Sequence, residues 1–116
     1  MGLCLDTAHA WGAGYKINAI KRLNSFVEEV DKKVGINRLK LIHLNDNPYG
    51  AGSRKDRHAH IGGGCIGRAG FKLIINHSIL RNVPFILETP KEKESDDKKN
   101  LSLVRRLYKN ELHKRN

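Results

Sequence analysis

One stretch of the sequence combines metal-ligating and basic side chains: Ser53-Arg54-Lys55-Asp56-Arg57-His58-Ala59-His60-Ile61-Gly62. In an extended segment, the alternating spacing of Asp56, His58 and His60 places the three side chains on one side of the backbone. Carboxylate and imidazole are ligands that zinc accepts, and the flanking arginines suit a phosphate. Taken alone, this loop fits a metal site and an ordinary solvated polar loop equally well.

The composition describes one small basic domain. The chain has 116 residues, with 22 Lys+Arg against 12 Asp+Glu and a formal net charge of +10. Residues 91–116 hold nine basic and five acidic side chains, which gives +4 and leaves +6 for residues 1–90. Such an excess favours a polyanionic partner, although a generally basic soluble surface is the alternative.

Neither a membrane segment nor a signal peptide is expected. No apolar run approaches the length of a membrane span, and the N-terminus lacks a charged start followed by a long apolar core. These features predict an intracellular protein that does not contact membranes. Cys4 and Cys65 are too few for a disulfide framework, so we expect free thiols with a packing role.

Strand-like apolar runs alternate with helical periodicities, which predicts an α/β fold of three βα units. The expected strands cover residues 2–5, 39–44 and 83–87, and the expected helices cover 17–33 and 68–76. A charged loop is expected at 91–99, with Ser95 or Asp96 capping a last helix whose apolar face is Leu101, Val104, Leu107, Tyr108 and Leu112. The long loop after residue 44 is typical of a functional segment or a disordered one.

Three polar residues fall at the ends of the expected strands: Asp6, His43 and Glu88. The carboxyl ends of parallel strands form the edge at which ligand chemistry is assembled. A buried, unpaired carboxylate costs several kcal/mol, and a shared divalent cation removes that cost. His9 follows Asp6 closely enough to reach the same edge, although a lone histidine there is more often an ordinary helix or turn residue. Together these residues predict a metal site.

Four segments, in this order, resemble the endonuclease IV family of apurinic/apyrimidinic endonucleases. They are Gly2-Leu3-Cys4-Leu5-Asp6-Thr7-Ala8-His9, His43-Leu44-Asn45-Asp46, the 53–62 loop and Ile86-Leu87-Glu88-Thr89-Pro90. The resemblance runs from Gly2 to the last helix. It implies a TIM barrel whose carboxyl-end face holds up to three zinc ions and cleaves double-stranded DNA 5′ to abasic sites in base excision repair.

The resemblance also implies roles for individual residues. Two ligand sets follow from it: Asp6, His43 and Glu88 for one zinc, and His9, Asp56 and His58 as the complete protein set of another. Three further residues would support the ligands without contacting the metal: His60, Asn45 and Asp46. The DNA backbone would be contacted by Arg54, Lys55 and Arg57.

The chain departs from the family mainly by being short. Three βα units, which the resemblance identifies as the last three, do not close a barrel of eight. Residues 1–116 would be the C-terminal part of the domain, with six of the family's nine protein ligands and at most one complete set. Ala8 and Ala59 replace a common cysteine and a common glutamate without removing a ligand. An N-terminal partner segment would be needed to complete the barrel.

Two other functions remain open. Related TIM barrels also place Asp, His and Glu around divalent metals, which allows a sugar isomerase, although the arginine-flanked loop argues against one. The missing ligands allow a non-catalytic fragment that binds zinc or DNA. We also expect the uncovered strands to make the isolated chain marginally soluble or oligomeric.

Overall fold

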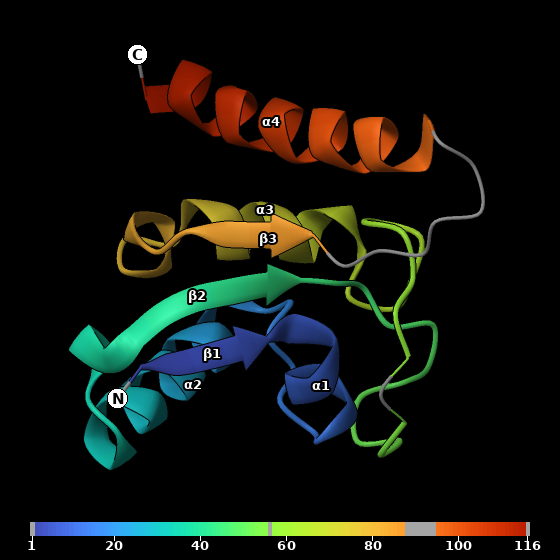
Figure 1. The fold of residues 1–116 in the computed structure, drawn as a ribbon. Coiled ribbons are helices and arrows are strands. Elements are labelled where there is room, and N and C mark those ends of the chain that lie inside the picture. The colour runs from blue at the N-terminus through green and yellow to red at the C-terminus, as the bar shows by residue number, and fades with distance from the viewer. Residues whose placement is uncertain (1, 56, 88–94, 116) are drawn as a thin grey trace.

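Three short strands form one parallel sheet in the order β1-β2-β3. The strands are β1 (Leu3–Asp6), β2 (Leu39–Leu44) and β3 (Phe85–Leu87), within a computed structural model that describes residues 2–55, 57–87 and 95–115. Asp6 lies beside His43, and His43 lies beside Ile86 in the strand register. All strands point to the same edge of the sheet, where the long loop after β2 also lies (Figure 1).

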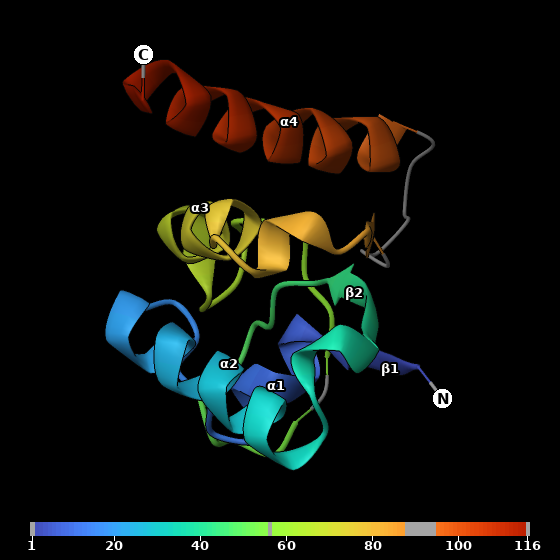
Figure 2. The same ribbon diagram turned by 90° about the vertical axis from the view of Figure 1, so that its left-hand side faces the viewer.

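The described helices cover one face of this sheet, the carboxyl end of β1 and the side beyond β3 (Figures 1 and 2). They are α1 (Thr7–Gly12), α2 (Ile20–Lys33), α3 (Gly67–Asn76) and α4 (Ser95–Arg115), with short 3-10 turns at Ile36–Arg38 and Leu80–Asn82. The longest, α4, packs mainly against α3. The parallel βα arrangement predicted from the hydrophobic pattern is confirmed.

The core forms where the apolar faces of the helices pack against the sheet. Its members recur every three or four residues along α2 and α3 and meet two side chains of the central strand: Leu23, Phe26, Val27, Phe71, Ile74, Ile75, Ile42 and Leu44. Phe71 and Ile42 are 0% exposed. Burial of one such side chain contributes about 1.5–3 kcal/mol, so this cluster fixes the sheet edge that carries the site.

The opposite face of the sheet is uncovered by any described helix (Figure 2). Side chains alternate between faces along a strand, so Cys4 and Leu41, which are register partners, share this side. Cys4 is exposed, Leu41 is half-buried, and Ile86 on β3 is 45% exposed. The described sheet is therefore open, with β1 and β3 at its edges, rather than a closed barrel.

Several expected boundaries were wrong. The charged loop expected at 91–99 ends earlier, because α4 already begins at Ser95. The third strand begins at Phe85, after Pro84, whose carbonyl accepts a hydrogen bond from the Ile42 amide at 2.9 Å. The first expected helix begins at Ile20 rather than residue 17, and α1 was not predicted because six residues are too short for a periodic signal.

No helix in the described ranges is long and apolar enough to span a bilayer.

Candidate metal centre

Asp6 ends β1 and caps α1. Its Oδ1 accepts hydrogen bonds from the backbone amides of Ala8 at 2.9 Å and His9 at 3.2 Å. These amides have no partner within the helix, so the carboxylate satisfies them and complements the positive helix end. The two backbone amides thereby fix Oδ1, which leaves Oδ2 to contact other side chains.

Oδ2 of Asp6 lies 3.3 Å from Nε2 of His58. Both side chains are partly buried, with 26% and 28% of their surface exposed. The side-chain amide of Asn45 donates to the same oxygen at 3.4 Å. The first strand and the loop beyond the second strand thus converge on one carboxylate oxygen.

A short antiparallel bridge brings His58 to this point. Ala59 pairs with Asp46, and the Ala59 amide donates to the Asp46 carbonyl at 2.8 Å. The next histidine belongs to a different contact: Nδ1 of His60 lies 3.0 Å from the amide nitrogen of Asn100 on α4. His58 and His60 therefore contact different parts of the chain, although their spacing alone would place them together.

His43 lies beside Asp6 on the neighbouring strand. Its side chain is half-buried, and Nδ1 is a buried ring nitrogen. His9 lies on α1 and is exposed, where it lines a pocket of about 280 Å³ together with Arg54 and Lys55. The structure thus places His43 next to Asp6, and places His9 beside two of the residues expected to contact DNA.

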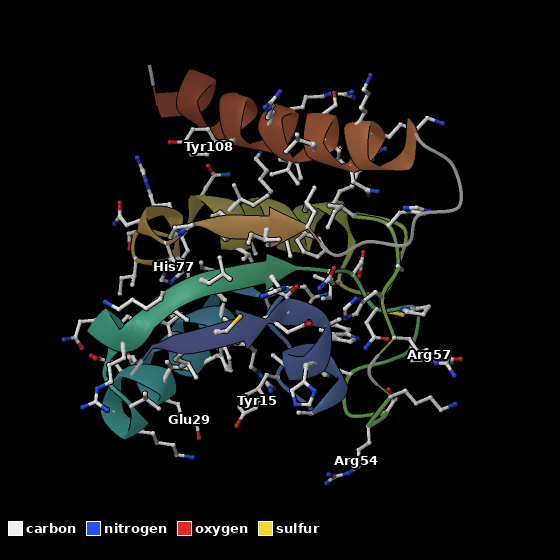
Figure 3. The ribbon with its side chains drawn as sticks, in the orientation of Figure 1. Tyr15, Glu29, Arg54, Arg57, His77 and Tyr108 are labelled. Atoms are coloured by element: carbon white, nitrogen blue, oxygen red, sulfur yellow. The ribbon has the colours of Figure 1, made fainter. Side chains whose placement is uncertain are left out.

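The basic loop, residues 53–62, is held in a defined conformation on either side of residue 56. Arg54 has a positive φ of 61°, which is unusual for a residue with a side chain, and its amide donates to the Gly12 carbonyl at 2.9 Å. The Lys55 ammonium lies 4.3 Å from the centre of the Tyr49 ring, a cation–π contact. Arg54 and Arg57 are exposed; Figure 3 shows Arg57 beyond the edge to which the strands point and Arg54 at the end of the loop below α1.

Asp46 organises the glycine-rich loop. Its buried carboxylate accepts five backbone N–H groups: from Asn47 at 2.8 Å, Gly62 at 3.1 Å, Gly64 at 2.9 Å, Ile66 at 2.9 Å and Gly67 at 3.2 Å. The position behind the ligands that the resemblance implied for Asp46 stays a prediction. The described contacts give it a structural task, because they hold the loop that leads from His58 into α3.

Two structural residues of the site were missed in the sequence. Thr7 Oγ1 donates to the Asn45 carbonyl at 2.7 Å and accepts from the Asn45 amide at 2.8 Å, which ties α1 to the end of β2. The Asn47 side chain donates to the carbonyls of Ala8 at 3.1 Å and Lys55 at 2.8 Å. A polar run directly after a buried strand was the available signal for Asn47.

The donor set around Asp6 suits zinc chemically. Carboxylate and imidazole are ligands that zinc accepts, and the 3.3 Å contact between Asp6 and His58 places one member of each expected ligand set next to the other. Within the described residues, no three His, Cys, Asp or Glu side chains gather closely enough to hold a metal. Two expected ligands, Asp56 and Glu88, lie outside the described residues.

Comparison with known proteins identifies the family. A family model described as a xylose isomerase-like TIM barrel matches residues 1–109. The chain belongs to this family. Among its TIM-barrel relatives is a protein named probable endonuclease 4 from Halothermothrix orenii, 50% identical over 107 residues that cover 91% of this chain and 38% of the relative. The protein of the same name from Aquifex aeolicus is 44% identical over 110 residues, covering 95% of this chain and 39% of the relative.

A solved TIM-barrel structure gives the same result. Endonuclease IV from Thermus thermophilus superposes with a TM-score of 0.82 at 36% identity, covering 95% of this chain and 39% of the solved chain. These matches confirm the resemblance to endonuclease IV and to the TIM-barrel class. The chain spans less than two fifths of the length of these relatives.

Proposed function

We propose that this chain supplies zinc ligands and DNA contacts to an endonuclease that cleaves the phosphodiester 5′ to abasic sites in base excision repair. The proposal rests on the Asp6–His58 contact, which joins a strand end to the basic loop in a chain similar to endonuclease IV. The ligands would be Asp6, His43 and Glu88 for one zinc, and His9, Asp56 and His58 for another.

Bound zinc would lower the pKa of a coordinated water and neutralise charge on the phosphate. The chain's own part is to hold the ligand atoms in place. The α1 amides fix Asp6 through Oδ1, and the Asp46–Ala59 bridge fixes the backbone next to His58. Ligands held by such backbone contacts keep their geometry when substrate binds.

The exposed cations of the loop would bind the DNA backbone. Arg54, Lys55 and Arg57 are all exposed, and phosphate contacts provide most sequence-independent affinity for DNA. An abasic nucleotide has already lost its base stacking, so turning it out of the duplex costs less than extruding a paired base. The three exposed cations beside the ligands therefore suit binding to an abasic duplex. We propose that the chain acts on such DNA inside the cell.

Unaided, the chain would bind zinc or DNA without turnover. The open sheet face and the coverage of 38% of a relative favour this second function for the isolated chain. Incision would require a partner segment that supplies the upstream βα units, with this chain as the last three units of the barrel. That segment would pair with β1 and β3 and cover Ile86.

The test is incision of an abasic duplex by the purified chain, alone and mixed with the complementary part of Thermus thermophilus endonuclease IV. We expect no cleavage by either part alone, cleavage 5′ to the abasic site by the mixture, and loss of cleavage on chelation. An intact duplex of the same sequence is the control. A mixture that forms a zinc-loaded complex but never cleaves would refute the endonuclease role.

A further inference from the structure

A second basic surface lies away from the proposed ligands, between the glycine-rich loop and α4. It is a pocket of about 610 Å³ formed by the loop after His58, the first turn of α3 and the first turns of α4. Its lining residues are His60, Ile61, Arg68, Lys98, Lys99, Asn100, Ser102, Leu103 and Arg106. The pocket thus combines four permanent cations with polar hydrogen-bonding groups.

The cations are not neutralised within the described part of the chain. Arg68, Lys98, Lys99 and Arg106 are exposed, and the described lining contains no carboxylate. The described ion pairs, Lys33–Glu29 and His58–Asp6, involve none of them. Like charges gathered around one hollow repel one another, so an anion bound there would relieve this repulsion.

The pocket wall is fixed by specific packing. Asn100, 4% exposed, accepts from the Ile61 amide at 2.8 Å and contacts Nδ1 of His60 at 3.0 Å, which joins α4 to the loop. Gly62 has a φ of +83°, and a Cβ there would lie 2.7 Å from Cγ of Arg68 and 3.5 Å from Leu103. The absent side chain therefore leaves room for the Arg68 stem to reach the pocket.

The position of the pocket relates it to the proposed site. The amino ends of α3 and α4 lie near the edge to which the strands point (Figure 1). The loop that carries Arg57 and His58 continues directly into His60 at the pocket wall. Two of the pocket's cations on α4, Lys98 and Lys99, lie within the first five residues of that helix.

We infer that this pocket binds a backbone phosphate of the nucleic acid, outside the stretch contacted by Arg54, Lys55 and Arg57. The inference rests on the proposed function, because continuity with the basic loop is what favours nucleic acid over a small free anion. Guanidinium and ammonium groups with neighbouring amide and hydroxyl donors are a suitable set for a phosphate diester. The pocket would extend the DNA interface without touching the scissile bond.

The experiment measures binding of the full chain to an intact, uncleavable DNA duplex over a range of salt concentrations. The double variant Arg68→Gln, Lys98→Gln should lower the slope of log K against log salt by about 0.9 for every phosphate that the variant no longer neutralises. The matched control, Lys32→Gln with Arg38→Gln, removes the same charge near the opposite ends of the strands and should leave the slope unchanged. Zinc content should be equal in all three proteins.

Several results would overturn the inference: no DNA binding by the parent chain, an unchanged slope in the pocket variant, or an equal decrease in the control. Inorganic phosphate is also added to the parent chain, and changes in its spectra would report a tight phosphate site. If such a site is found and the pocket variant has no effect on DNA binding, the pocket is a small-anion site instead. Because this duplex is never cleaved, the two proposals can fail separately. If the pocket variant shows the slope change but the zinc-loaded mixture with the complementary part never cleaves abasic DNA, the endonuclease role is refuted and the phosphate site stands.

Discussion

Oδ2 of Asp6 and Nε2 of His58 lie 3.3 Å apart, although one residue ends the first strand and the other lies in the loop beyond the second. The two proposed ligand sets meet at this contact, because Asp6 belongs to one set and His58 to the other. Its geometry depends on backbone contacts that hold each residue separately. Changes to those contacts should therefore alter the site without touching a ligand.

Replacing Asp46 with Asn should destabilise the fold. The isosteric amide keeps one acceptor oxygen but turns an N–H₂ group toward backbone amides that Asp46 now accepts. Loss of charged hydrogen bonds at a fully buried carboxylate predicts a decrease of about 2–4 kcal/mol in the free energy of unfolding, measured by urea denaturation.

The control for this change is Asp31→Asn. Asp31 is exposed and accepts a single backbone amide, from Ile36 at 2.9 Å. Its replacement should lower the free energy of unfolding by less than about 1 kcal/mol. Equal effects of the two variants would show that the Asp46 carboxylate does not organise the loop.

Alanine should be tolerated at Gly50 but not at Gly64. A Cβ at Gly64 would lie 2.5 Å from the Asn47 carbonyl and 2.6 Å from the Asp46 carboxylate, whereas one at Gly50 meets nothing within 4 Å. Because the clash is with a hydrogen-bonded backbone and a fixed carboxylate, we expect a loss of about 2–4 kcal/mol for Gly64→Ala and a negligible change for Gly50→Ala. Similar denaturation midpoints for the two would contradict the packing described here.

His77 should make stability depend on pH. Burial lowers its pKa, and the neutral ring accepts the Ile79 amide at Nδ1, 3.2 Å away, while Nε2 lies 2.8 Å from Oδ1 of Asn24. The unfolded chain binds the proton below about pH 6.5, before the folded chain does. Stability is therefore full above that pH and falls as the pH decreases through the lowered pKa.

The measurement is the free energy of unfolding at several pH values for the parent chain and for His77→Gln. The variant should be less stable near pH 8 and show a smaller decrease from pH 7 to pH 5. A variant with the same pH slope as the parent would show that another group is responsible.

Ile86→Thr should reduce self-association. Ile86 is 45% exposed on the uncovered side of an edge strand, where an apolar side chain favours contact between copies. Ile20→Thr is the matched control, because Ile20 is 48% exposed on α2. Size-exclusion chromatography with light scattering should show a larger monomer fraction for Ile86→Thr alone. A monomeric parent chain with cooperative unfolding would contradict the expectation.

The strands and the position of their polar ends were predictable from the sequence, because buried strands give continuous apolar runs. The register confirms that Asp6 and His43 lie side by side. The choice of His58 over His60 followed from the family resemblance, because the alternating spacing alone treats the two residues alike. The structure adds the contact of His58 with Asp6 and a bridge between Asp46 and Ala59. That bridge joins distant segments, and no local pattern encodes it.

The structural role of Asp46 also could not be predicted from the sequence. A carboxylate after a strand predicts chemistry at the sheet edge, but five backbone amides from a later loop surround this one. The glycines at 62 and 64 are the local trace of that arrangement, because a side chain at Gly64 would occupy the carboxylate's space. A glycine run alone was equally compatible with a flexible loop.

The most direct test of the proposed zinc centre is the zinc content per chain of the purified protein, of His58→Ala and of His60→Ala, each equilibrated with the same free zinc concentration. We predict that the parent and His60→Ala bind zinc equally, because His60 contacts Asn100 rather than Asp6. We predict that His58→Ala loses most of the bound zinc, because it removes the imidazole that faces Asp6. Unchanged zinc content in His58→Ala would contradict the assignment of this edge of the sheet as a metal centre.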